Sequence, residues 1–384
     1  MKIAVIGGGF AGLLFAYKLA VKGYDVYLYE EHSRVGFPKH CTGLVSSRTV
    51  ELIGGPAQRN TISKYRGVIL ETGSSQCVIE TIDDVIKLDR VGLEEDLKEE
   101  AEASGAKIYM RTKVESVKPN GSLSIGGHTR AYDLVVLAEG IHGRLRRSLG
   151  LERRLLTTYG YNIEVEAPNA GVNSEHIVIE FRRGLAGFAW RVPLPRGSLY
   201  GALSRSPRQS KRILEEAMAS NSPADVYGGV VVHGPPLERP RVGRVVVVGD
   251  AAGFNKPLTG GGLYPNSLLA DLIASRDLAS GDYYLIDDAV SKVVSVLSRQ
   301  FRIARAYYSS PGRGYRVLDV IVRRGFCESL SGKLTYDGHE ALVSVVLSSP
   351  SRLIRLLLGI LSEGVLRDAG VLLAYYLGLK KARM

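Results

Sequence analysis

A glycine-rich turn close to the amino end constrains this chain more than any other feature. An apolar, β-branched run, KIAVI, leads directly into Gly7, Gly9 and Gly12, which have the spacing G-x-G-x-x-G. The run before the turn is typical of a buried strand, and the residues after it have helical character. The expected order is a strand, a helix and a second strand over residues 2–6, 13–21 and 25–29. This order defines a dinucleotide-binding unit of Rossmann type.

Each glycine in this turn has a separate physical role. Gly7 permits the tight turn out of the strand, Gly9 allows the backbone to approach a pyrophosphate, and Gly12 lets the helix pack closely on the strand. The helix N-terminus favours a diphosphate because its first N–H groups are free. Glu30 ends the second strand, where its carboxylate can accept hydrogen bonds from ribose hydroxyls. A glycine-rich turn without a ligand is the competing interpretation, and this context disfavours it.

Length and composition limit the class of protein. A chain of 384 residues with 45% hydrophobic residues can form one large domain or two joined domains with a full core. We expect no signal peptide, since the first strand begins at Lys2, and no spanning helix, since no run of about eighteen apolar residues occurs. Three cysteines are too few for a disulfide framework, so a reducing, cytoplasmic location is expected.

The chain is basic, with a formal net charge of +11. The basic residues are scattered and no nucleic-acid-binding module is recognisable, so a nucleic-acid partner is not expected. Attraction to anionic phosphate headgroups explains the charge and favours peripheral contact with the inner face of the membrane. An arginine-rich surface on a thermostable protein explains the same charge.

The pattern along the chain leaves the nucleotide-binding part and later returns to it. Long alternating strands over 157–232 indicate an antiparallel sheet with a helix at 210–219, and the apolar run 241–248 indicates a buried strand that ends at Asp250. A helix is expected over 263–280, and the remainder is expected to be mainly helical, with breaks near 309–312 and 348–350. A cofactor held by both Gly7–Gly12 and Asp250–Gly262 must be long, and FAD fits better than NAD.

The predicted fold class is α/β, with a Rossmann-type FAD-binding domain, an inserted antiparallel-sheet substrate domain and a helical C-terminal region. Four ranges express this division: 1–150 for the FAD-binding part with a small sheet insertion at about 62–82, 151–240 for the substrate domain, 241–285 for the return to the FAD-binding domain, and 286–384 for the helical region.

Three motifs together resemble the FAD-dependent oxidoreductases that include p-hydroxybenzoate hydroxylase. They are the glycine turn with Glu30, the stretch DLVVLAEG at 133–140, and GDAA at 249–252. The resemblance implies that Asp250 binds the ribitol of FAD and that Arg90 lies near the flavin chain. The second motif departs from the pattern, because it reads Glu-Gly where Asp-Gly is usual, and this weakens a nicotinamide role there.

Finer motifs resemble the geranylgeranyl reductase family over roughly residues 1–330. They are PKHCTGL at 38–44, GFNKPLTGGGL at 253–263 and GFAWRVP at 187–193, with Phe188 where tyrosine is frequent and Val192 where phenylalanine is frequent. The resemblance implies an FAD-dependent reductase that saturates isoprenoid double bonds of archaeal ether-lipid precursors, by hydride from the reduced flavin plus a proton. An isoprenoid ether lipid is therefore the expected substrate.

The expected site residues follow from these motifs, and no metal ligand is among them. The cofactor-binding set is Gly7, Gly9, Gly12, Glu30, Cys41, Thr42, Leu44, Arg90, Val114, Asp250, Gly262 and Leu263. The substrate-pocket set is Phe188, Trp190 and Pro257. Consecutive glycines before the helix at 263 can place N–H groups against the pyrimidine edge of a flavin and stabilise its reduced form.

Cys41 is the candidate catalytic residue, and three roles for it remain open. It is a packed loop thiol, a pocket wall with a proton-donating role, or half of a disulfide with Cys327. Cys77, in an alternating strand, is expected to be structural. A proton donor is needed because an isolated alkene is a poor electrophile, and a dry, apolar pocket supplies proximity and excludes water.

Several functional alternatives also remain open. The apolar, basic segments 351–361 and 371–379, followed by the basic residues 380–383, can wall a lipid tunnel, lie on a bilayer or pack as ordinary buried helices. A flavin-dependent monooxygenase or halogenase and a flavoprotein electron carrier are the competing functions. No motif identifies the electron donor, which can be ferredoxin, a nicotinamide or a deazaflavin.

Overall fold

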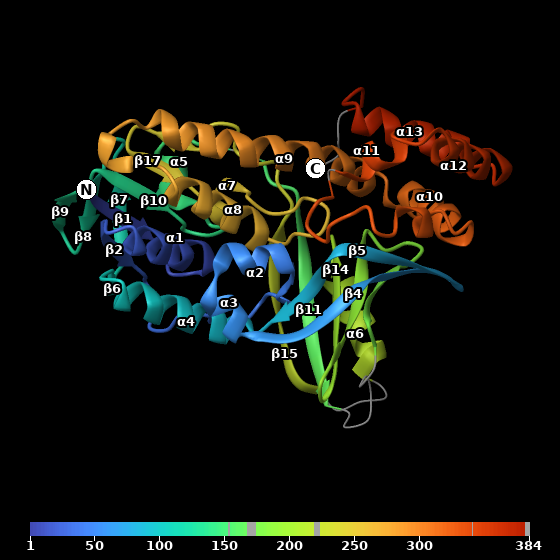
Figure 1. The fold of residues 1–384 in the computed structure, drawn as a ribbon, viewed down its shortest axis with the longest axis horizontal. Coiled ribbons are helices and arrows are strands. Elements are labelled where there is room, and N and C mark those ends of the chain that lie inside the picture. The colour runs from blue at the N-terminus through green and yellow to red at the C-terminus, as the bar shows by residue number, and fades with distance from the viewer. Residues whose placement is uncertain (153, 167–173, 219–222, 340, 381–384) are drawn as a thin grey trace.

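The computed structural model describes residues 1–152, 154–166, 174–218, 223–339 and 341–380. Part of the predicted strand region 157–232, the predicted helix end at residue 219 and the basic residues 381–383 lie outside these ranges. A nucleotide-binding lobe forms one end of the molecule, and a lobe built on a large sheet lies toward the other end, below a group of C-terminal helices (Figure 1). The mixed α/β fold class predicted from the sequence is confirmed.

A six-stranded sheet forms the nucleotide-binding lobe, with the order β16-β17-β10-β1-β2-β6. It is parallel except for β16, and its central strands are apolar and almost fully buried, as parallel strands between two helical layers must be. The strands are β1 (Lys2–Ile6), β2 (Asp25–Tyr29), β6 (Lys107–Tyr109), β10 (Leu134–Leu137), β16 (Arg241–Val242) and β17 (Val245–Val247).

Helices and a small sheet surround these strands. The long helix α9 runs along the top of the lobe, above α8 and α1 (Figure 1). The elements are α1 (Phe10–Val21), α2 (Ser47–Ile53), α3 (Gly55–Arg59), α4 (Arg90–Ala103), α5 (Arg144–Ser148), α7 (Gly249–Ala252), α8 (Leu263–Ala274), α9 (Tyr284–Ser309), and the sheet β7 (Val114–Val117), β8 (Ser122–Ile125) and β9 (His128–Ala131). The sequence did not predict β9, because all four of its residues are exposed and it has no apolar alternation.

Two predicted boundaries in the returning segment were wrong. The run 241–248 is not one strand, because Gly243, at φ 59°, turns the chain between the antiparallel β16 and β17. The helix expected to continue to 280 ends at Ala274, and a separate 3₁₀ turn, η1 (Leu278–Ser280), begins at a cap formed by Asp277. A capping aspartate starts a new turn more readily than it continues a helix.

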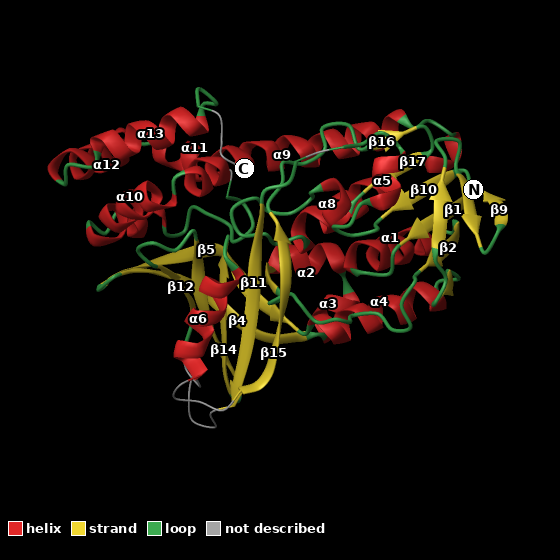
Figure 2. Ribbon diagram, turned by 180° about the vertical axis from the view of Figure 1, so that it is seen from behind, coloured by secondary structure: helices red, strands yellow, loops and turns green. Residues whose placement is uncertain are grey.

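An eight-stranded sheet forms the second lobe, with the order β15-β11-β14-β13-β12-β4-β5-β3 (Figure 2). Helix α6 (Pro207–Met218) packs on β11 and β14. The strands are β3 (Leu44–Ser46), β4 (Thr61–Thr72), β5 (Ser75–Leu88), β11 (Thr157–Glu166), β12 (His176–Phe181), β13 (Gly187–Leu194), β14 (Gly197–Ser204) and β15 (Pro223–Val232).

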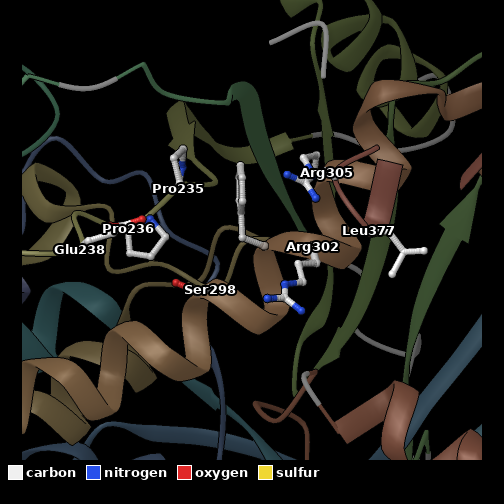
Figure 3. A pocket seen from close by; sticks show the side chains of 9 residues that line it. Pro235, Pro236, Glu238, Ser298, Arg302, Arg305 and Leu377 are labelled. Carbon is white, nitrogen blue, oxygen red and sulfur yellow. The ribbon is translucent and has the colours of Figure 1, made fainter. Parts of the chain in front are cut away.

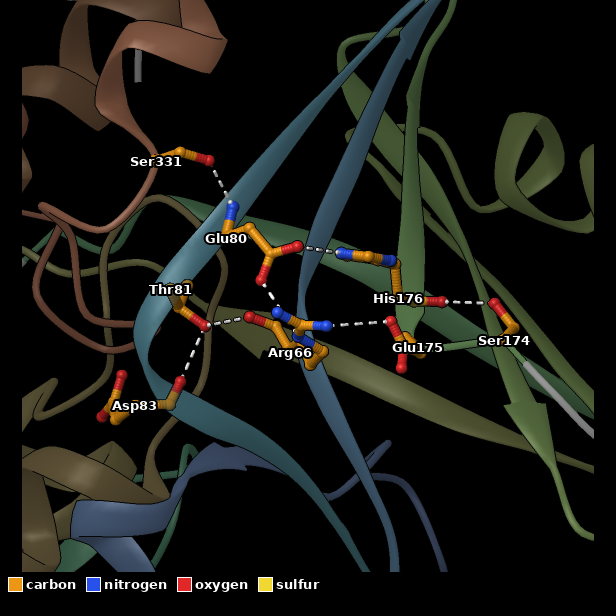
Figure 4. A network of polar contacts seen from close by, with 8 residues as sticks. All are labelled: Arg66, Glu80, Thr81, Asp83, Ser174, Glu175, His176 and Ser331. Atoms are coloured by element: carbon orange, nitrogen blue, oxygen red, sulfur yellow. Dashed lines mark hydrogen bonds and ion pairs between the residues drawn. The ribbon is translucent and has the colours of Figure 1, made fainter.

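The strands over 62–82 do not form the separate small sheet that was expected. Strand β4 pairs in parallel with β12, so β3, β4 and β5 extend the large sheet. Polar contacts reinforce the junction: the Arg66 guanidinium lies 3.3 Å from both Glu80 and Glu175, and His176 lies 3.2 Å from Glu80 (Figure 4). Pairing between strands about a hundred residues apart leaves no local trace in the sequence.

Helices and one 3₁₀ turn make up most of the C-terminal region. The predicted breaks are confirmed, since Pro311 and Pro350 each occupy the first position of a new helix. The elements are α10 (Pro311–Arg323), η2 (Cys327–Leu330), α11 (Ala341–Leu347), α12 (Pro350–Ser362) and α13 (Leu366–Tyr376). Among the described helices, none is both long and apolar enough to cross a membrane.

Cys77 on β5 and Cys327 in η2 form a disulfide, with a Cα–Cα distance of 6.3 Å. This pairing excludes the predicted alternative in which Cys327 pairs with Cys41, which is free. Both paired cysteines are buried with Val322, so the bond joins the large sheet to the C-terminal helices across 250 residues of sequence. The sequence did not indicate this pair, because β5 and η2 come together only in the folded protein.

Replacing Cys327 with serine is expected to lower the free energy of unfolding by about 2–4 kcal/mol, because the bond restricts the unfolded chain. Thermal or denaturant unfolding of oxidised protein measures the loss. The difference between the two proteins should disappear in reductant. The matched substitution of the free thiol, Cys41→Ser, keeps the disulfide and should lose stability in reductant as the unmodified protein does. Equal stabilities of Cys327→Ser and the unmodified protein under oxidising conditions would contradict the expectation.

Candidate functional site

The glycine turn has the geometry that its sequence predicts. Gly7 has φ +103°, and a Cβ there would collide with the carbonyl of Ala138. A Cβ at Gly12 would collide with the carbonyl of Gly7, so the close contact between helix and strand requires glycine. Nothing lies within 4 Å of a Cβ position at Gly9, and α1 has no side-chain cap. The N-terminus of α1 therefore presents N–H groups to an open space.

Glu30 faces the same turn from the end of β2. Its Oε2 accepts a hydrogen bond from the backbone N–H of Gly8 at 2.5 Å, and its Oε1 accepts one from the N–H of His32 at 2.7 Å. The His32 ring also donates to Oε1 at 2.5 Å. These bonds hold a mostly buried carboxylate beside the turn, where it retains lone pairs for hydroxyl donors.

The second glycine-rich loop reaches the start of α1 from the far end of the chain. The Cβ position at Gly249 lies 3.3 Å from the Cβ of Ala11, so the motif at Asp250 adjoins the first turn. The Asn255 amide donates to Asp250 at 3.0 Å. Gly262 precedes α8, which also lacks a side-chain cap, and Leu263 is the buried first residue of that helix. The uncapped N-termini of α1 and α8 therefore both border the second glycine-rich loop.

Asn266, which the sequence did not single out, holds this loop in place. Its Oδ1 accepts from the N–H of Gly249 at 2.9 Å, and its Nδ2 donates to the carbonyls of Phe254 at 2.8 Å and Gly262 at 2.7 Å. An asparagine on the buried side of a mainly apolar helix was the available signal, since a buried polar group must find partners.

Arg90 and the loop that contains Cys41 complete the region. The Arg90 guanidinium lies 5.1 Å from the ring centre of Phe10, the first residue of α1, and forms a buried ion pair with Glu94. It also contacts the thiol of Cys41. A Cβ at Gly43 would meet the Arg90 side chain at 3.0 Å, so the loop packs directly on this arginine.

The same loop packs against the large sheet through polar contacts. The Thr42 hydroxyl donates to Asn162 at 2.9 Å. Lys39 lies 2.8 Å from Glu164 and 2.9 Å from Asp225, and the Tyr227 hydroxyl donates to Glu164 at 2.9 Å. Cys41, half-buried, is therefore held between the nucleotide-binding lobe and β11 and β15.

Lys87 is a further member of this region that the sequence did not reveal. Its side chain is 4% exposed and its Nζ donates to the carbonyl of Leu88 at 2.8 Å. Burial lowers the pKa of Lys87 to about 8, and the charges of Glu164 and Cys41 oppose that shift. A lysine whose pKa lies near neutral pH can both hold a proton and release it to a neighbouring thiol.

Two of the three predicted pocket residues, Phe188 and Trp190, lie in an aromatic cluster. The rings of Phe188 and Trp190 are 5.7 Å apart, and Phe188 is buried with Tyr307 and Tyr308. The indole N–H of Trp190 is buried and makes no hydrogen bond within the described part of the chain. Leu258 of the second loop packs on the same cluster, and its carbonyl accepts from Tyr308 at 3.0 Å.

His233 anchors Pro257 to the large sheet. Its Nδ1 donates to the Pro257 carbonyl at 2.8 Å, and its Nε2 accepts from the Thr158 hydroxyl at 2.7 Å. Burial lowers the pKa of His233 to about 4, so the ring is neutral. Beside it, Lys256 and Asp337 form an ion pair at 2.5 Å in which each side chain is 3% exposed.

The remaining predicted site residues lie at the edges of this region. Leu44 begins β3 directly after the Cys41 loop. Val114 lies in the small sheet, where its carbonyl accepts from Arg144 at 2.9 Å. Glu139, the residue that departs from the Asp-Gly pattern, accepts hydrogen bonds from the N–H groups of Leu145 and Arg146 and caps α5. That the predicted site residues contact a cofactor remains a prediction.

The fold and site define a two-lobed oxidoreductase architecture in which a dinucleotide turn meets a second glycine-rich loop. Residues 5–51 match the sequence model of the NAD(P)-binding Rossmann-like domain family. The chain is 28% identical to digeranylgeranylglycerophospholipid reductase of Methanothrix thermoacetophila over 73% of this chain and 79% of the relative. It is 22% identical to digeranylgeranylglycerophospholipid reductase 3 of Methanosphaera stadtmanae over 92% and 97% of the two chains.

Solved structures share the fold. A geranylgeranyl bacteriochlorophyll reductase-like protein from Thermoplasma acidophilum superposes with a TM-score of 0.75 at 18% identity, covering 93% of this chain and 98% of the other. The flavin-dependent brominase Bmp2 superposes with a TM-score of 0.63 at 14% identity, covering 92% and 100%. These superpositions show the fold, and the named sequence relatives confirm the resemblance to geranylgeranyl reductases read from the motifs.

Stability should fall as the pH decreases from about 6.5 toward 4, because His233 must remain neutral in the folded protein. The pKa of an unfolded histidine is about 6.5 and the folded value is about 4. The contribution is therefore complete above pH 6.5 and is lost as the pH falls, by up to about 1.4 kcal/mol per pH unit.

Denaturant unfolding of the unmodified protein and of His233→Gln between pH 4 and pH 7 tests this expectation. The glutamine keeps a donor and an acceptor but does not titrate, so its stability curve should be flatter over this range. Parallel curves for the two proteins would contradict the assignment. His128→Gln, which replaces an exposed histidine, is the matched control.

Proposed function

We propose that this protein is an FAD-dependent reductase that saturates isoprenoid double bonds of archaeal ether-lipid precursors. One observation carries the proposal: Glu30, Arg90, the Cys41 loop and the Asp250 loop all converge on the N-terminus of α1. Segments this far apart in the chain would meet there to hold an extended ligand. The named sequence relatives supply the reaction class.

Two observations support the binding of FAD by these residues. The open space at Gly9 and the uncapped start of α1 suit a pyrophosphate, and Glu30 suits the adenosine ribose. The uncapped start of α8 suits an anionic ring edge, with Asp250 near the ribitol. When bound and reduced, FAD supplies the hydride for the alkene.

The protein must supply the proton, and the region of Cys41 is the proposed source. The thiol contacts Arg90, and the charges of Cys41 and Lys87 interact. Cys41 acts as the proton donor at Sγ in this proposal, and the Lys87 ammonium restores the proton. The aromatic cluster around Phe188 and Trp190 forms the dry wall of the isoprenoid pocket, because burial of apolar surface excludes water.

The proposed substrate is an isoprenoid ether lipid, and the electron donor is ferredoxin, a nicotinamide or a deazaflavin. The protein acts in the cytoplasm, in peripheral contact with the inner face of the membrane. A flavin-dependent monooxygenase or halogenase is the second candidate, favoured by the structural likeness to the brominase Bmp2.

An anaerobic reoxidation experiment tests the proposed reaction. The purified protein is reduced with dithionite and mixed with an unsaturated archaeal-type ether phospholipid. Return of oxidised flavin absorbance together with a mass gain of two hydrogens per double bond is the expected result. Flavin that remains reduced until air is admitted would contradict the reductase and favour the oxygenase or an electron carrier.

Replacing Asp250 with alanine is expected to reduce flavin bound per protein at least about tenfold, because a carboxylate at the start of α7 would no longer bind the ribitol. The ratio of visible to ultraviolet absorbance after purification measures occupancy. Asp271→Ala is the control. It removes a carboxylate of α8 that pairs with Lys18 of α1, and this variant should retain flavin. Full occupancy in Asp250→Ala would remove Asp250 from the cofactor site.

The rate of anaerobic reoxidation should fall above about pH 8, because Lys87 then loses the proton it supplies. Lys87→Met should lower the rate at pH 7 by about tenfold or more and abolish this alkaline decline. The exposed Lys64 on the neighbouring β4 offers a matched control, and Lys64→Met should keep the profile of the unmodified protein. An unchanged profile in Lys87→Met would show that the proton comes from another group.

A further inference from the structure

Large aliphatic side chains gather on the outer helices of the C-terminal region. Helices α12 and α13 lie at the periphery, at the end of the molecule opposite β9 (Figure 1). Half of the exposed large hydrophobic residues of the described chain fall here, each 44–77% exposed: Ile354, Leu357, Leu358, Leu361, Leu366, Leu373, Leu377 and Leu379. Isolated exposed leucines are ordinary, but a cluster on two adjacent helices indicates an interaction surface.

The helical period shows that this surface is separate from the packing of the fold. On α12, Ile354, Leu358 and Leu361 recur at spacings of four and three residues and share one face. The opposite face, with Gly359 and Ile360, packs on α10. The outer apolar face therefore adds nothing to the core, and no described residue covers it.

The charges around the apolar face are positive. The acids of α12–α13 and their connection, Glu363 and Asp368, are both paired with arginines of α10. Arg355, Arg367 and Lys380 make no ion pair within the described ranges. An apolar stripe bordered by unpaired cations is complementary to an anionic lipid surface and not to a second basic, apolar surface of the same kind.

A cationic hollow adjoins the end of this surface. A cavity of about 410 Å³ lies between α9, the loop after β15 and the end of α13, and Leu377 belongs to both the cavity and the apolar face (Figure 3). Arg302 and Arg305 line it together with Glu238, so positive charge is in excess, and Arg305 donates to the Tyr376 carbonyl at 2.9 Å. Arg302 has no hydrogen-bond partner among the described residues, so its guanidinium is available to a phosphate.

We propose that the outer face of α12 and α13 docks the protein on a bilayer containing anionic phospholipids. The leucines and Ile354 enter the interfacial region, while Arg355, Arg367, Lys380 and the cavity arginine Arg302 bind headgroup phosphates. Docking of this kind needs no bound flavin and goes beyond the proposed reaction, so it is tested independently of turnover.

Flotation with vesicles tests the docking surface. The purified holoprotein is mixed with vesicles of phosphatidylcholine alone or of phosphatidylcholine with about one-third phosphatidylglycerol. Binding is expected to be at least about tenfold stronger to the anionic vesicles and to weaken in salt. An unmodified protein that remains in solution with both vesicle types would overturn the proposal.

Two variants test whether vesicle binding depends on this surface or on any exposed apolar residue. Ile354→Glu combined with Leu358→Glu and Leu373→Glu should reduce vesicle binding at least about tenfold, because three carboxylates would enter the interface. Val21→Glu is the matched control, since Val21 is as exposed as Ile354, at 57%, but lies on α1. Unchanged binding by the folded triple variant, confirmed by its melting temperature, would overturn the assignment.

A charge variant and the oligomeric state complete the test. Arg355→Glu with Arg367→Glu should abolish the preference for anionic vesicles, whereas Arg208→Glu on the exposed side of α6 should keep it. Sedimentation of the protein without lipid measures its oligomeric state. A stable dimer that the triple glutamate variant dissociates would show that a second copy of the chain covers this face, and would overturn the membrane assignment.

Discussion

The close contact between α1 and the first strand is the constraint on which the rest of the structure depends. Since Gly12 has no side chain, the helix packs directly against the carbonyl of Gly7, and the N-terminus of α1 opens at the edge of the parallel sheet. Glu30, Arg90 and Gly249 all lie against this helix end. One steric requirement at one glycine thus determines where three distant motifs can meet.

Buried polar groups then hold the loops that surround this point. Asn266 binds both ends of the second glycine-rich loop, His233 holds Pro257, and Lys256 is neutralised by Asp337 from the C-terminal region. Burial raises the pKa of Asp337, but the Lys256 ammonium and hydrogen bonds from Ser46 and Thr49 lower it overall. Removing one partner would leave a buried charge without compensation, so these contacts make the loop geometry specific.

The C-terminal region contributes to the candidate site and also reaches the surface of the molecule. It contributes Asp337 to the site region, Cys327 to the bond with β5, and Tyr307 and Tyr308 to the aromatic cluster. Its outermost helices keep a second apolar face, bordered by cations. A protein that acts on lipid-borne double bonds needs both a dry pocket and access to lipid, and the same helical region would serve the two needs.

The sequence by itself determined the nucleotide turn, the buried strands and the proline breaks, because each depends on contacts between near neighbours or on a single residue's conformational limits. Gly7, Gly12, Pro311 and Pro350 are of this kind. Only the tertiary structure decided the parallel pairing of β4 with β12, the bond between Cys77 and Cys327, and the burial of Lys87. These features join residues far apart in the chain, and no local pattern records which distant partner a strand, a thiol or a charge will meet.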